Sequence, residues 1–267
     1  MFEKITNIIA LSLVIGIILT ICLLLRGRFS KNFEDILKQN IGSFEINRRY
    51  VILYTLIFIP TFIYIMLNLS SYIILYFYFF AGFLILGFLG YILTKNPAAL
   101  LSGLIYPILY FNYWNIYTFN LIACLFAIFI ILLMSNLIKW NLLKLFFVLL
   151  LIMDIILVFI TKDMVHLGNK IVSLQIPILI FIPFGQGITI GLGDVFIIGL
   201  LCVRFTKEKE YAGTKSMVFV WITAALFLIV LFIVATYLPR QPYPATIFVA
   251  LSFMGAAILF EKVAGRS

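Results

Sequence analysis

The chain has 267 residues, of which 65% are hydrophobic and 11% charged, and its formal net charge is +9. A soluble domain is usually about half apolar and one quarter charged, so this composition excludes an ordinary soluble protein. The basic residues do not gather on a soluble face, which argues against nucleic acid as a partner and favours a role in membrane orientation.

The apolar residues fall into nine runs, and several reach the roughly 20 residues that a helix needs to cross ~30 Å of hydrocarbon. The predicted spans are 5–25, 51–67, 72–93, 98–111, 117–137, 142–161, 188–205, 217–237 and 244–260. The fourth run is short, as a tilted or half-buried helix would be. A signal peptide alone cannot explain apolar runs that continue to the C-terminus. We therefore expect an all-α polytopic membrane protein with about nine transmembrane helices.

The connections between these runs are short, except for 26–50 and 162–187. We expect one membrane domain over the whole chain, 1–267, with helices one to five in 1–141 and helices six to nine in 142–267. The three cysteines lie inside apolar runs, a distribution that indicates neither a disulfide framework nor a metal cluster: Cys22, Cys124 and Cys202.

The basic residues divide unequally between the two sides of the predicted helices. With nine spans, fifteen of the 19 Lys and Arg residues fall on the side of the C-terminus. The opposite side holds four: Lys4, Lys162, Lys170 and Arg240. Cytoplasmic loops carry an excess of Lys and Arg, so we expect the N-terminus outside and the C-terminus in the cytoplasm, most simply at the plasma membrane.

Two of the ten acidic residues are embedded in apolar helix. Asp154 lies in "FVLLLIMDIILVFITK", and Asp194 heads the apolar part of "GITIGLGDVFIIGLL". An ionisable group at membrane depth costs a few kcal/mol, which makes it a functional candidate. The structural alternative is a polar contact between helices, because no Lys, Arg or His is embedded to form a salt bridge.

The two aspartates are predicted to lie at a similar depth. At 1.5 Å per residue, Asp154 is about 12 Å of helix from Lys162, and Asp194 is about 9 Å from Ile188. Two carboxyl groups in contact cannot both ionise cheaply and tend to share one proton. Such a pair performs aspartic protease chemistry, in which one member takes a proton from water and the other polarises the scissile carbonyl. This reaction requires no metal or other cofactor.

Glycines surround the second aspartate: Gly185, Gly187, Gly191, Gly193 and Gly199. Gly191 and Gly193 flank Leu192 directly before Asp194, where the absence of side chains would let a substrate backbone approach. Close helix packing is the alternative explanation, because small residues are common at membrane helix interfaces.

The stretch "SLQIPILIFIPF", 173–184, is too short to cross a membrane, and its prolines and β-branched residues favour an extended segment. Pro177 and Pro183 remove donors from one edge, so the edge that includes Ile178 and Ile180 keeps its N–H groups. We hypothesise that this intact edge pairs with an unwound substrate by β-augmentation. A linker at the lipid interface is an equally good interpretation.

Three of these features, in this order across 142–260, resemble the GxGD intramembrane aspartyl proteases: presenilin, signal peptide peptidase and their archaeal homologues. They are Asp154 in span six, Gly191-Leu192-Gly193-Asp194 at the start of span seven, and "QPYPATIF" at the start of span nine, where the family carries Pro-Ala-Leu. The family also has nine spans. Two residues differ from its usual pattern, since Met153 stands where the family has Tyr and Thr246 where it has Leu.

The resemblance implies a role for each matching residue. Asp154 and Asp194 would be the catalytic pair. The substrate would be bound by the residues that match the two other motifs: Gly191, Leu192, Gly193, Pro244, Ala245 and Thr246. A register at Gln241-Pro242 is a weaker match to the third motif. Substrates would be transmembrane segments or signal-peptide remnants, and the outside N-terminus is similar to the signal peptide peptidase orientation.

Two other functions fit the aspartates. A prepilin or preflagellin peptidase also uses GxGD but usually has fewer spans, and a secondary transporter would use both carboxylates to couple protons or cations. The single histidine, His166, and the lack of an HExxH motif exclude an intramembrane zinc protease, and no GxSG-like element indicates a serine protease. The lipid bilayer is an expected partner, whereas a homo-oligomer or accessory subunits stay open.

Overall fold

The computed structural model describes residues 2–40, 47–183, 188–211, 213–237 and 243–264. Among these residues, seven helical segments are long and apolar enough to cross a membrane. Two shorter helices, Pro97–Asn112 and Leu192–Glu208, cover the remaining predicted runs. The prediction of an all-α polytopic membrane protein with about nine transmembrane helices is confirmed.

The first five predicted spans correspond to α1 (Phe2–Asn40), α2 (Arg48–Leu53), η1 (Tyr54–Phe58), α3 (Ile59–Asn68), α4 (Ser71–Thr94), η2 (Pro97–Leu104), α5 (Ile105–Asn112) and α6 (Ile116–Leu137). A π-helical segment, η1, joins α2 and α3 into one span. α6 begins where Asn115 accepts hydrogen bonds from the N–H groups of Tyr117 and Thr118, a capping box that fixes this helix end.

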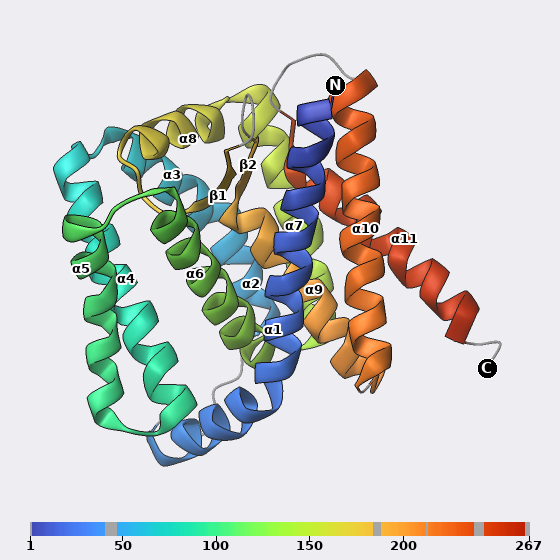
Figure 1. Ribbon diagram of the computed structural model, residues 1–267, viewed down its shortest axis with the longest axis horizontal. Coiled ribbons are helices and arrows are strands. Elements are labelled where there is room, and N and C mark those ends of the chain that lie inside the picture. The colour runs from blue at the N-terminus through green and yellow to red at the C-terminus, as the bar shows by residue number, and fades with distance from the viewer. Residues whose placement is uncertain (1, 41–46, 184–187, 212, 238–242, 265–267) are drawn as a thin grey trace.

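The remaining elements are α7 (Trp140–Ile155), η3 (Ile156–Ile160), α8 (Asp163–Ser173), β1 (Leu179–Ile182), β2 (Ile188–Gly191), α9 (Leu192–Glu208), α10 (Thr214–Tyr237) and α11 (Ala245–Ala264). The strands β1 and β2 form an antiparallel hairpin in which Leu179 faces Gly191 and Ile182 faces Ile188. In Figure 1, α8 and this hairpin lie at the same end of the bundle as the N-terminus.

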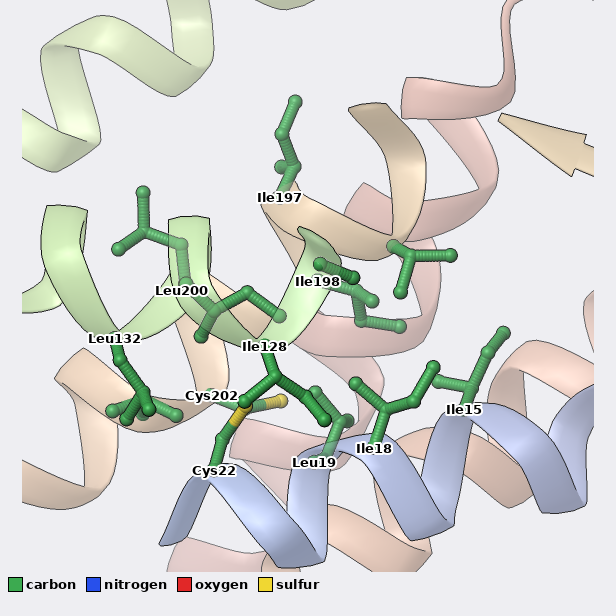
Figure 2. Close-up of a cluster of buried hydrophobic side chains, with 14 of the residues drawn as sticks. Ile15, Ile18, Leu19, Cys22, Ile128, Leu132, Ile197, Ile198, Leu200 and Cys202 are labelled. Atoms are coloured by element: carbon green, nitrogen blue, oxygen red, sulfur yellow. The ribbon is translucent and has the colours of Figure 1, made fainter. Parts of the chain in front are cut away.

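α9 is the central helix of the bundle. It packs against α1, α6, α7, α10 and α11. Its buried side chains meet those of α1 and α6 in a continuous apolar core, which Figure 2 shows for Ile18 and Leu19 of α1, Leu132 of α6 and Ile198 of α9. This packing holds the N-terminus of α9, and with it Asp194, at a fixed level in the bundle.

Three boundaries differ from the sequence-based predictions. The first helix continues to Asn40 through what we expected to be a polar connection, since 26–40 stays helical after the apolar run ends. The seventh predicted span, 188–205, begins with the strand Ile188–Gly191, because these residues pair with β1 before α9 starts. In the segment 173–184, the predicted extended conformation is present as the strand Leu179–Ile182.

Candidate active site

Asp154 lies near the end of α7, one residue before its last residue, Ile155. Its side chain is partly buried. Its Oδ2 atom accepts hydrogen bonds from the hydroxyl of Thr246, 2.7 Å away, and from the backbone N–H of Thr246, 3.3 Å away. The neighbouring Met153 points elsewhere, into a second apolar cluster between α7, α8 and α3. The carboxylate is therefore fixed by α11 rather than by the residue that precedes it.

Asp194 lies in the first turn of α9, directly after the hairpin. The chain changes from strand to helix at Gly191, whose φ of −66° and ψ of 142° are ordinary for an N-cap residue. The Asp194 side chain is partly buried and close enough to Asp154 for the two carboxylates to interact electrostatically. The end of one helix and the start of another thus bring the two acidic groups together.

Both aspartates line one cavity of about 460 Å³. Its lining comes from α7, α8, the hairpin, the start of α9 and the residues around the start of α11. Apart from the two carboxylates, the polar side chains in this lining are Asn169, Thr189 and Tyr243. The cavity thus combines a mostly apolar wall with a pair of acids, an arrangement suited to an apolar peptide and a reaction of acid–base type.

The three residues before Asp194 all line this cavity. A Cβ atom added at Gly191 would lie 3.1 Å from the Asp194 Oδ2 atom, whereas one added at Gly193 would meet nothing within 4 Å. Leu192 is mostly buried, and its N–H donates to the carbonyl of Ile178 at 2.9 Å. The predicted proximity of Gly191, Leu192 and Gly193 to the aspartates is thus present, while Gly185 and Gly187 lie outside the described residues.

The Pro-Ala-Thr element lies at the start of α11, but its members differ in position. Ala245 lines the cavity, Pro244 is buried, and its carbonyl accepts a hydrogen bond from Ile247. Thr246, expected to contact substrate, is only 2% exposed and contacts Asp154 instead. The alternative register at 241–242 lies outside the described residues.

The edge of the extended segment that we expected to be free is already paired. The hydrogen bond from Leu192 to Ile178, together with the hairpin register, directs the backbone groups of Ile178 and Ile180 toward β2. This expectation was wrong because the sequence identifies an edge with intact donors but not the strand that occupies it. Ile178 still lines the cavity, whereas Ile180 is fully buried.

The opposite edge of β1 is bound by a side chain from α6. The amide of Asn120 accepts a hydrogen bond from the N–H of Phe181, 2.9 Å away, and donates to its carbonyl, 2.7 Å away. The backbone of Thr189 and the N–H of Gly191 take no part in the pairing with β1, because residues alternate along an antiparallel ladder. The outer edge of β2 is therefore the strand edge beside the aspartates.

Neither Asn120 nor Lys170, on α8, belongs to a motif that the sequence indicates. The Lys170 ammonium donates to the carbonyls of Met66, Leu67 and Leu69, at 3.1, 2.8 and 2.6 Å. These groups lie at the C-terminal end of α3, so the lysine caps that helix and fixes α8 beside the cavity. An amide inside the apolar run 117–137 was a usable signal for Asn120, although Asn136 in the same run gives the same signal. Nothing local to Lys170 indicates its partners.

His166 is exposed on α8 and does not line the cavity. Within the described part of the chain, no group of three or more His, Cys, Asp or Glu side chains could hold a metal ion.

Comparison with known proteins gives a structural match but no sequence match. No protein-family model matches the chain, and no curated protein matches its sequence. A solved structure of a presenilin-family intramembrane aspartate protease superimposes with a TM-score of 0.62, covering 95% of this chain and 99% of that chain at 16% sequence identity. The chain therefore has the presenilin-like fold that its three motifs predicted.

Proposed function

We propose that this chain is an intramembrane aspartyl endopeptidase that hydrolyses peptide bonds in transmembrane segments of other membrane proteins. The observation that carries the proposal is that Asp154 and Asp194, from different helices, line one cavity within electrostatic range of each other. The presenilin-like fold supports it, because the similar structure is that of an intramembrane aspartate protease.

The chemistry follows from two carboxyl groups that share one proton. The ionised member takes a proton from a water molecule, and the water oxygen bonds to the scissile carbonyl carbon. The protonated member gives its proton to the carbonyl oxygen, so that no isolated charge develops in an apolar environment. The cleavage needs no covalent intermediate with the protein.

The substrate segment would bind in an extended conformation along the outer edge of β2. Peptide bonds inside a helix are already hydrogen-bonded, so the substrate must unwind, and a strand edge compensates its backbone groups. Thr189 and Gly191 lie on this edge and line the same cavity as Asp194. Gly193 would admit the scissile bond, because a side chain there would lie in the cavity.

The proposal includes the orientation of the chain in the lipid bilayer. The excess of Lys and Arg on the C-terminal side favours an outside N-terminus and a cytoplasmic C-terminus in the plasma membrane. Because α8 and the hairpin lie at the N-terminal end of the bundle (Figure 1), the cavity would then lie toward the outer face. Signal-peptide remnants and the transmembrane segments of other membrane proteins would be the substrates.

The test is cleavage of a fluorogenic transmembrane peptide by the purified protein in lipid vesicles. We expect Asp154→Asn and Asp194→Asn each to lower the rate by about a hundredfold or more, because each removes one partner of the acid–base pair. Asp163→Asn is the matched control, since Asp163 does not line the cavity, and it should cleave normally.

Other outcomes would reject the proposal. Equal cleavage by all three variants would show that the aspartate pair is not the catalytic group. Cation or proton uptake by vesicles that show no cleavage would favour a transporter. Cleavage only of a peptide that carries a prepilin leader, outside its apolar segment, would favour the prepilin-type peptidase.

A further inference from the structure

The carboxylate of Asp154 is held by the first turn of α11. Both the hydroxyl and the backbone N–H of Thr246 donate to its Oδ2 atom, at 2.7 and 3.3 Å. α11 begins at Ala245, so this N–H is one of the first-turn groups that have no acceptor within their own helix. Asp154 therefore caps α11 from another helix, as an N-cap side chain would.

Thr246 acts on the cavity only through this carboxylate. Its side chain is 2% exposed and does not line the cavity, so a bound substrate would not reach its hydroxyl. The GxGD proteases usually carry leucine here, which has no hydrogen-bond donor in its side chain. The bond from Thr246 is thus a property of this chain.

We propose that Thr246 is a positioning residue that gives the two aspartates different roles, with Asp154 as the base and Asp194 as the acid. This assignment rests on the proposed protease function. An oxygen that accepts hydrogen bonds from both an N–H and an O–H carries no proton itself, and such donors favour an ionised carboxylate. Around Asp194, in contrast, the described residues supply burial and the nearby Asp154 carboxylate but no comparable pair of donors, so the shared proton is assigned to Asp194.

With these roles, every proton that is transferred in the hydrolysis has a donor and an acceptor. Asp154 removes one proton from water while the water oxygen bonds to the carbonyl carbon, and Asp194 transfers its proton to the carbonyl oxygen. When the C–N bond breaks, Asp154 gives its proton to the leaving amine nitrogen. Asp194 takes a proton from one hydroxyl of the gem-diol, which restores both carboxyl groups to their starting states.

Few other ionisable groups face this pair. Within the described lining of the cavity, the titratable side chains are Asp154, Asp194 and Tyr243. α8 contributes only uncharged residues to that lining, and from α11 only Ala245 lines it. The pH dependence of cleavage should therefore report mainly on the aspartate pair.

The test compares Thr246→Val with the wild-type protein in the peptide assay. Valine keeps the shape of the side chain but removes its hydroxyl. We expect kcat to fall about tenfold to a hundredfold, the effect of one hydrogen bond to a charged group, with KM little changed. The acidic limb of the pH–rate profile should move to higher pH by about one unit, because Asp154 loses a donor that favours its ionised form.

Two further variants separate the hydroxyl from packing. Thr246→Ser and Thr246→Ala both lack the methyl group and differ by the hydroxyl alone, so their comparison is decisive even if the valine variant does not fold. Serine should keep the wild-type pH profile, and alanine should behave like valine. Thr223→Val is the matched control, because the buried Thr223 hydroxyl donates to the Phe219 carbonyl of its own helix.

The failure of this assignment can be told apart from that of the protease proposal. If Asp154→Asn abolishes cleavage while Thr246→Val keeps the wild-type kcat and pH profile, Thr246 has no positioning role. The same conclusion follows if the serine variant is as slow as the alanine variant. If the wild-type protein cleaves no peptide, the protease proposal is rejected and the assignment with it.

Discussion

Gly191 and Gly193 lie two residues apart beside Asp194, yet an added side chain would meet different surroundings at each. At Gly191 a Cβ atom would press on the Asp194 carboxylate, 3.1 Å away. At Gly193, in the first turn of α9, it would enter open space in the cavity. A side chain at Gly191 would therefore affect the Asp194 carboxylate itself, and one at Gly193 would reduce the space in the cavity.

Gly193→Ala should separate stability from activity. Alanine favours a helix more than glycine does, so the melting temperature should not fall. Cleavage should slow by about tenfold or more, because the methyl group would displace the scissile bond from the aspartates. Gly27→Ala, on α1 with open space around it, is the matched control and should leave the rate unchanged. A normal rate in Gly193→Ala would mean that the substrate does not approach this position.

The sequence indicated the candidate residues of the site better than it indicated their contacts. The cost of a carboxylate in apolar helix identified Asp154 and Asp194, because no local structure is needed to see that cost. Thr246 was assigned to substrate because it follows Pro244-Ala245 in the motif. Its contact with Asp154 is made between residues 92 positions apart, which no local pattern can predict.

Among the elements, α8 is joined to α3 by the polar side chain of Lys170 as well as by apolar packing. Lys170 bonds three carbonyls at the end of α3, and several residues of α8 line the cavity. Lys170 therefore connects a helix of the N-terminal half of the chain to the wall of the site.

Lys170→Met should weaken the attachment of α8 to α3. Methionine keeps most of the apolar part of the side chain but lacks the ammonium group that donates to the α3 carbonyls. We expect the free energy of unfolding to fall by about 2 kcal/mol, the effect of losing hydrogen bonds to a charged group, and cleavage to slow. Lys162→Met, at an exposed residue just before α8, is the control and should change neither quantity. Chemical denaturation in mild detergent measures the first quantity and the peptide assay the second. A fully stable Lys170→Met protein would show that the lysine is not a structural contact.

Only one of the two strands of the hairpin could be predicted from local sequence. Prolines and β-branched residues favoured an extended segment over 173–184, and the structure has the strand Leu179–Ile182 within it, because these properties are local. That 188–191 forms its partner strand, rather than the first turn of α9, depends on pairing across the loop. Asn120, which binds the other edge of β1, comes from a helix 61 residues earlier in the chain.

For the whole molecule, the packing of α9 decides where Asp194 lies. α9 touches five other helices, and Gly199 allows it to approach α6 and α1 closely. A Cβ atom at Gly199 would overlap with the Ile131 side chain and would lie 3.0 Å from Leu19 Cδ2. Apolar length alone identifies seven of the predicted runs as helices that could span a membrane in the described part of the chain. The close approach of α9 to its neighbours is a property of the assembled bundle.

Gly199→Val should therefore force α9 away from its neighbours. Overpacking of this kind costs about 1–3 kcal/mol of unfolding free energy, and cleavage should fall because Asp194 moves with the helix. Gly27→Val introduces the same side chain into open space, and its unfolding free energy should change much less. If the two variants were equally stable, the packing around Gly199 would have to be looser than the contacts indicate.

The outer edge of β2 also has a consequence for how water would reach the two aspartates if the proposed hydrolysis takes place. Peptide groups cannot face lipid tails without a hydrogen-bonding partner, so the free backbone groups of β2 would bind water before a substrate arrives. A substrate that forms backbone hydrogen bonds with Thr189 and Gly191 would displace some of this water beside Asp154 and Asp194. The backbone groups of β2 that bind the peptide would thus also be the groups that hold water for its hydrolysis.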